Sequence, residues 1–201
     1  MDLTPLEVIQ QFVAGKISPP EFRDLLYNHD GFEELLTNDP NLKRPNYVLL
    51  AGSAYHFVIS QSYDDAAGIV NAQNALCDYL KRNKIEFERT SVYEDLHDVL
   101  LDAQPKWLLV DSYWISQNIM PQAEGRTGKA LLNWLKEQLH ERFQFASKPP
   151  KWLRNPNWPL GPHGPLVFLG QVKIEGYFKD KAAAYVFYDP ESKETKTILQ
   201  S

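Results

Sequence analysis

A stretch that is dense in proline and tryptophan limits the possible folds of this chain more than any other feature. Between Lys148 and Pro165 the sequence holds six prolines and two tryptophans, Trp152 and Trp158. Proline lacks a backbone N–H and clashes with the preceding helical turn, so this stretch is incompatible with a regular helix. It favours an extended, turn-rich path that separates two kinds of sequence.

The residues before this stretch have the patterns of amphipathic helices. The segments Thr4-Pro5-Leu6-Glu7 and Ser18-Pro19-Pro20-Glu21 both fit a capping box, with a hydroxyl residue at the N-cap and glutamate at N3. Apolar periodicity predicts further helices over 32–36, 65–82, 91–103 and 127–143. Residues 46–62 fit either a helix or a strand, and 85–89 fits a short strand. A helix could begin at Pro105 and run to Ile115, although Trp107–Asp111 could equally be a strand.

The residues after the stretch read as strands. Leu166–Ile174, Ala183–Asp189 and Glu194–Gln200 are rich in β-branched and aromatic residues, with a turn at 189–192. We therefore predict an α+β fold in a single domain over 1–201. A mainly helical region, 1–145, would be followed by a small C-terminal antiparallel sheet within 148–201.

The acidic residues are concentrated at the start of the chain. The first 40 residues contain eight acids against Lys16 and Arg23, a net charge of −6, although the whole chain carries only −5. Such a segment repels nucleic acid and anionic membrane and attracts a basic protein. The alternative interpretation is a solvated helical surface that has no partner.

The features that report on cellular location are few. Cys77 is the only cysteine, so no intramolecular disulfide can form. The first residues lack the basic and apolar regions of a signal peptide. The most apolar run, Tyr47–Ile59, is shorter than the roughly 20 residues of a membrane span. We expect a cytoplasmic protein.

Two Glu-x-x-His pairs are the nearest approach to a metal motif. Glu94 with His97, and Glu137 with His140, have the spacing found in di-metal helical bundles. Both pairs lie on the polar side of their expected helices, away from the apolar stripe. We therefore predict no metal site.

Gly125–Ala130 has some likeness to a phosphate loop. Ala123 and Ala130 stand where such a loop needs a glycine and a Ser or Thr, so Thr127 is expected to cap a helix instead. Cys77, on the apolar face of its helix, is expected to be structural. No catalytic residue and no cofactor are predicted.

The strongest family resemblance lies near the end of the chain. Trp158-Pro159, Gly164–Gln171 and Ala184–Asp189 resemble the core of the YwqG-like family of bacterial proteins. The whole chain also resembles a family of bacterial proteins of similar length, with a helical front and a Lys-Pro-Pro-Lys-Trp to Gly-Gln ending. The resemblance implies a place in polymorphic toxin loci, where small acidic proteins neutralise a neighbouring toxin.

The resemblance and the acidic front together suggest an immunity protein that binds a cognate, basic toxin without catalysis. Asp24, Asp30, Glu33 and Glu34 are the expected contact residues. The alternative is a small-molecule-binding or enzymatic domain with its pocket around Trp158 and Gln171. A structural adaptor in a larger assembly is a third possibility, and the oligomeric state stays open.

Overall fold

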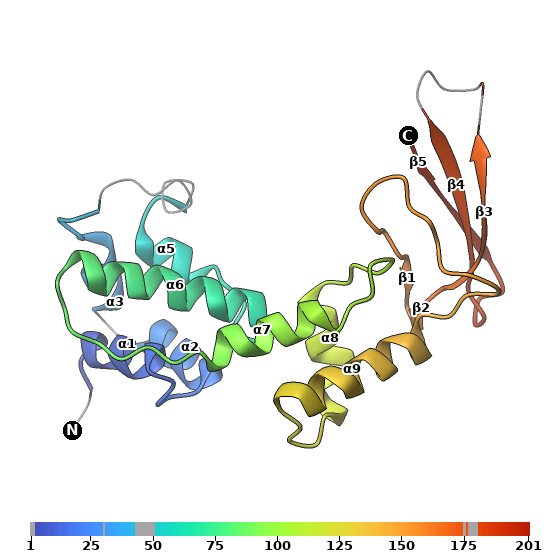
Figure 1. Ribbon diagram of the computed structural model, residues 1–201. Helices are drawn as coiled ribbons and strands as arrows, with labels where there is room; N and C mark the ends of the chain where they lie inside the picture. Colours follow the sequence, from blue (N-terminus) through green and yellow to red (C-terminus); the bar gives the residue numbers. More distant parts are fainter. Residues whose placement is uncertain (1–2, 30, 43–50, 175, 177–180) are drawn as a thin grey trace. The chain divides into compact units, whose positions relative to one another are not determined.

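The computed structural model describes residues 3–29, 31–42, 51–174, 176 and 181–201 (Figure 1).

The chain divides into two compact units, Met1–Asp98 and Val99–Ser201, and the boundary falls within one helix. Helices make up the first unit, whereas the second combines helices with all the strands of the described residues. This confirms the α+β class and the predicted order of a helical region followed by an antiparallel sheet. The single domain over 1–201 stays a prediction.

The first unit is a group of helices that begin at polar caps. Thr4 and Glu7 form a full capping box at the first helix, whereas the Ser18 side chain accepts a hydrogen bond from the Glu21 amide at the second. Asp65 caps the longest helix by accepting from the Gly68 amide. The helices of this unit, together with the one that crosses its boundary, are α1 (Pro5–Val13), α2 (Pro19–Asn28), α3 (Phe32–Thr37), α5 (Ala54–Ile59), α6 (Ala66–Arg82) and α7 (Val92–Asp102).

An aromatic group lies at the centre of the first unit. Phe12 stacks on Phe22 with ring centroids 4.1 Å apart and packs against Tyr93 at 5.5 Å. Gln73 is the buried polar residue beside them, and its side-chain amide donates to the carbonyls of Val13 and Thr90. These two bonds join α6 both to the end of α1 and to the segment before α7.

The expected strand at 85–89 is not present. Within the segment, the Glu86 carbonyl accepts from the Gln10 side chain. Directly after it, the Thr90 amide donates to the Val13 carbonyl, so both bonds join this stretch to α1 and its end. Ile85 and Phe87 still pack against the core from this extended segment.

The structure assigns most of the two regions that the sequence left open between helix and strand. Within 46–62, Ala54–Ile59 is helical, and residues 46–50 lie outside the described residues. Residues 105–111 are neither helix nor strand. The Gln104 side chain accepts from the Val110 amide at 2.6 Å and donates to its carbonyl at 3.1 Å, so it closes this segment into a loop.

The helices of the second unit follow that loop. They are α8 (Ser112–Asn118), the short 3-10 helix η1 (Met120–Gln122) and α9 (Gly128–Arg142). Thr127 occupies the N-cap position of α9, but its side chain makes no capping hydrogen bond, so this part of the prediction is wrong. The first residue of α9, Gly128, has a positive φ of 52°, so the first turn departs from the regular geometry that a side-chain cap requires.

The second unit contains two antiparallel sheets. β1 (Leu160–Gly161) pairs with β2 (Gly164–Pro165), and β3 (Val167–Ile174), β4 (Ala182–Tyr188) and β5 (Thr195–Gln200) form a sheet in the order β3-β4-β5 (Figure 1). The predicted turn follows β4, where the Asp189 side chain accepts from the Glu191 and Ser192 amides.

The proline-rich segment lies along one face of the larger sheet. Gln171, Tyr185 and Gln200, one from each strand, hydrogen-bond to its backbone between residues 151 and 155. Trp152 packs on Tyr185, and the buried ring of Trp158 contacts Phe187. Both tryptophans therefore anchor the segment by packing against the sheet.

Candidate functional site

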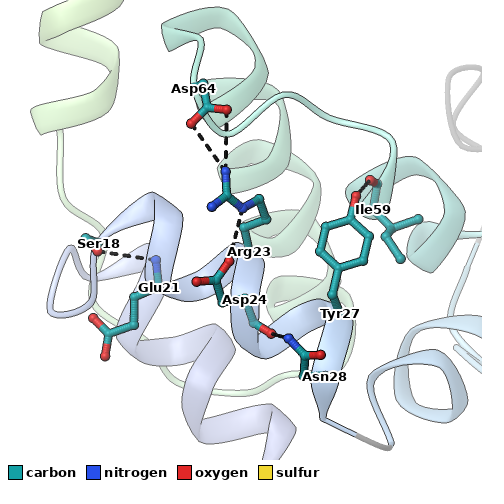
Figure 2. A network of polar contacts seen from close by, with 8 residues as sticks. All are labelled: Ser18, Glu21, Arg23, Asp24, Tyr27, Asn28, Ile59 and Asp64. Carbon is teal, nitrogen blue, oxygen red and sulfur yellow. Dashed lines mark hydrogen bonds and ion pairs between the residues drawn. The ribbon is translucent and has the colours of Figure 1, made fainter.

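The predicted contact residue Asp24 lies on the exposed side of α2. Its carboxylate is 67% exposed and lies 3.2 Å from Nε of Arg23. Nη1 of the same guanidinium lies 3.3 Å from Asp64, so Arg23 is shared between two acids (Figure 2). The three side chains together keep a net negative charge, and the Arg23–Asp64 contact ties α2 to the residues just before α6.

An exposed aromatic residue lies one helical turn from Asp24. Tyr27 has an exposed fraction of 58%, and its hydroxyl donates to the Ile59 carbonyl at the end of α5 (Figure 2). The Asn28 side chain donates to the Asp24 carbonyl at 2.7 Å and extends the polar surface of α2. Tyr27 is therefore fixed at its hydroxyl end while its ring remains open to solvent.

Glu33 is an exposed acid of α3, a helix that contacts α5. Burial raises the pKa of the Tyr55 phenol, and the negative charges of Glu33 and of ionised Tyr27 raise it further. Tyr55 therefore lies within electrostatic range of both residues. We call Asp24, Tyr27, Glu33, Tyr55 and Asp64 the tyrosine patch.

Of the other two predicted contact residues, the structure describes only Glu34, which is not part of the tyrosine patch. Glu34 is exposed but lines a separate hollow of about 550 Å³, with Leu6, Leu35 and Tyr79 in its wall. Asp30 lies outside the described residues. Of the predicted contact residues, Asp24 and Glu33 are included in the patch, whereas Glu34 lines a different hollow, and their role in binding stays a prediction.

Tyr27 and Tyr55 were missed in the sequence. The exposure of Tyr27 could have been predicted from the sequence, because Tyr27 lies outside the apolar stripe of α2. That stripe contains Phe22, Leu25 and Leu26. An aromatic residue at such a position is exposed, and exposed aromatic rings are common anchors in protein interfaces.

The second unit holds the pocket region of the alternative hypothesis, but with different walls. Trp158 is 5% exposed and belongs to the aromatic core. Trp107 and Trp152 line a hollow of about 430 Å³ instead. Gln171 lines a neighbouring hollow of about 390 Å³, where its amide oxygen accepts from the Lys151 amide at 2.6 Å.

The residues with possible catalytic or metal chemistry occupy structural positions. Cys77 is buried, and burial raises the pKa of its thiol, which opposes thiolate formation. Glu94 pairs with Arg89 at 3.0 Å, and the His140 ring packs edge-on against Trp107. In the part of the chain that the structure describes, no three metal-ligating side chains gather.

Comparisons of the chain with protein-family models, with curated proteins and with solved structures gave no match. The resemblance to the YwqG-like family therefore stays a prediction. Among the helices of the described residues, none is long and apolar enough to cross a membrane.

Proposed function

We propose that this chain is an immunity protein that binds and neutralises a basic bacterial toxin through the tyrosine patch. The observation that carries the proposal is the exposed ring of Tyr27, which lies one helical turn from the exposed carboxylate of Asp24. An aromatic anchor with charged neighbours is a common arrangement at the centre of protein interfaces.

The charge distribution of the chain supports a basic partner. The first unit contains sixteen acids against eight lysines and arginines, a net charge of −8, so the second unit carries +3 of the total of −5. A strongly negative unit accelerates the approach of a positively charged protein and weakens that of anionic surfaces.

Different residues of the tyrosine patch would then determine the association rate and the lifetime of the complex. Asp24, Glu33 and Asp64 set the rate of association and its dependence on salt. Tyr27 loses its exposed area on binding and so sets the lifetime of the complex. Arg23 keeps Asp24 and Asp64 in place without cancelling the charge of both.

The proposal is tested by affinity capture followed by co-expression. The tagged chain is used to capture proteins from its source bacterium, and the captured partner is then expressed in a host with and without this chain. We expect a basic partner that arrests growth by itself and does not do so when this chain is present. A captured partner that leaves growth unaffected, or arrest that this chain fails to relieve, would contradict the proposal.

A further inference from the structure

Two neighbouring hollows in the second unit are surrounded by positive charge. The hollow that contains Trp107 and Trp152 and the one that contains Gln171 share Lys148, Pro149 and Lys151 in their walls. We call the pair the basic double hollow. Its cationic lining residues are Lys106, Lys148, Lys151, Arg154 and Lys173, and none of the lining residues that the structure describes is acidic.

The backbone that carries these cations is held in place. Gln171 binds both backbone groups of Lys151, at 2.6 Å and 3.1 Å. The Gln200 side chain accepts from the Arg154 amide at 3.0 Å, and two consecutive prolines follow Lys148. A site whose backbone is already ordered loses less entropy on binding than a mobile loop does.

The charge of this site is available to a ligand. Among the described residues, none of the five cations forms an ion pair with an acidic side chain. Nε of Arg154 donates to the backbone oxygen of Ser201 at 2.5 Å, so the charge open to a ligand is mainly that of the four lysines. Lysine and arginine side chains are donors only, so the groups they recognise are acceptors, and anionic ones above all. Phosphate oxygens fit this requirement.

Two indole rings add a flat apolar surface to the site. The Trp152 N–H donates to the Trp107 carbonyl at 2.8 Å, so this indole offers only its ring to a ligand. Trp152 packs on Tyr185 with centroids 4.5 Å apart and ring planes tilted by 31°, and Trp107 lines the same hollow. Aromatic platforms beside cations are the combination that binds the bases and phosphates of nucleotides.

We propose that the basic double hollow binds nucleotides, either free or as part of a single strand, through their phosphates and a stacked base. The acids that argued against nucleic acid belong to the first unit, whereas the unit with this hollow carries a net charge of +3. The Gln171 side chain is already hydrogen-bonded to the Lys151 backbone. We therefore expect the site to recognise the charge and the ring of a nucleotide, with little preference for a particular base. This inference does not depend on the tyrosine patch or on a toxin partner.

The test is a titration of the full chain with two probes. Fluorescein-labelled oligothymidylate is followed by fluorescence anisotropy, and ATP is followed by quenching of tryptophan emission. Both titrations are repeated on the double variant Lys148→Gln/Lys151→Gln. The matched control is Lys136→Gln/Lys196→Gln, which removes two exposed lysines of the same unit that lie outside the hollow.

We expect saturable binding that the Lys148/Lys151 variant weakens about tenfold, with a salt dependence that is shallower by about one charge per lysine. The control variant is expected to bind like the wild type. Binding of oligothymidylate without ATP would assign the site to a single strand, and binding of ATP with the same variant sensitivity would assign it to a free nucleotide. Either result supports the proposal.

Three results would overturn it. One is the absence of saturable binding for both probes. Another is equal loss of affinity in the Lys148/Lys151 variant and its control. The third is displacement of the oligonucleotide by polyglutamate at equal concentration of charge, which would make the hollow a site for acidic protein segments. Thermal melts of both variants establish that each remains folded.

Discussion

The carboxylate of Asp39 lies 3.0 Å from Nη2 of Arg82, with its side chain fully removed from solvent. The Asn83 side chain and the Asn41 amide donate to its other oxygen, both at 3.0 Å. Asp39 is one of the eight acids of the first 40 residues, and yet a partner cannot reach it. The number of acidic residues in this segment is therefore larger than the number of carboxylates that a partner could contact.

Removal of the Asp39 carboxylate is expected to destabilise the first unit. Asp39→Ala leaves Arg82 partly buried without its counter-ion, so the free energy of unfolding should fall by about 3 kcal/mol in urea titrations. The matched control is Asp24→Ala, which removes an exposed acid and should change stability by less than about 1 kcal/mol. Equal effects of the two variants would contradict the burial of Asp39.

Gly68 is expected to resist replacement by alanine although it lies within α6. Alanine usually stabilises a helix by up to about 1 kcal/mol relative to glycine. A Cβ at Gly68 would lie 2.2 Å from the Ser62 carbonyl oxygen, so the backbone would have to move. Gly68→Ala should therefore lower the free energy of unfolding by about 1–3 kcal/mol. An increase in the thermal melting temperature would refute this close approach.

The capping box of α1 makes a pH-dependent contribution to stability. The Thr4 amide and then the Thr4 hydroxyl donate to Glu7, and these bonds lower the pKa of Glu7 from its usual 4.5. A lowered folded-state pKa stabilises the fold above about pH 4.5, and the contribution is lost as the pH falls through the lowered value. Urea midpoints of wild type and Glu7→Gln should therefore differ at neutral pH and converge in acid. A constant difference across that range would contradict the assignment.

The hydroxyl of Tyr185 is expected to hold the proline-rich segment on the sheet. It donates to the Lys151 carbonyl at 3.1 Å and accepts from the Leu153 amide at 2.8 Å. Tyr185→Phe removes both bonds but keeps the ring beneath Trp152, so we expect a loss of about 1–3 kcal/mol in unfolding free energy. The Leu153 amide also donates to the Gln200 side chain at 3.0 Å, so its hydrogen exchange should accelerate only in part. The exposed control Tyr113→Phe should leave both stability and exchange unchanged. A Tyr185→Phe variant as stable as the wild type would exclude this role.

Features set by neighbouring residues in the sequence were predictable. The caps at Thr4, Ser18 and Asp65 depend on residues three positions away, and the turn at Asp189 depends on the next three. The β-rich runs after the prolines also matched the strands closely, because each run has its own composition and boundaries.

Features set by distant contacts were not predictable. The segment at 85–89 pairs with no strand of the described residues, and its Glu86 carbonyl accepts instead from Gln10, 76 residues away in the sequence. Burial of Asp39 depends on Arg82, 43 residues further along. The candidate site follows the same rule, since the negative charge of Glu33 acts on Tyr55 whereas the adjacent Glu34 lines a different hollow. No local sequence pattern distinguishes the surroundings of these two adjacent glutamates.

The central claim, that the tyrosine patch binds a basic partner, is tested most directly by the affinity of the captured protein for three variants. Tyr27→Ala should raise Kd by at least about tenfold, whereas Tyr27→Phe, which keeps the ring, should bind like the wild type. Asp24→Lys/Glu33→Lys should also weaken binding, and more at low salt than at high salt. The control Glu86→Lys reverses an exposed acid outside the patch and should bind more tightly than the double variant. Unchanged affinity for Tyr27→Ala and for the charge-reversed double variant would contradict the claim.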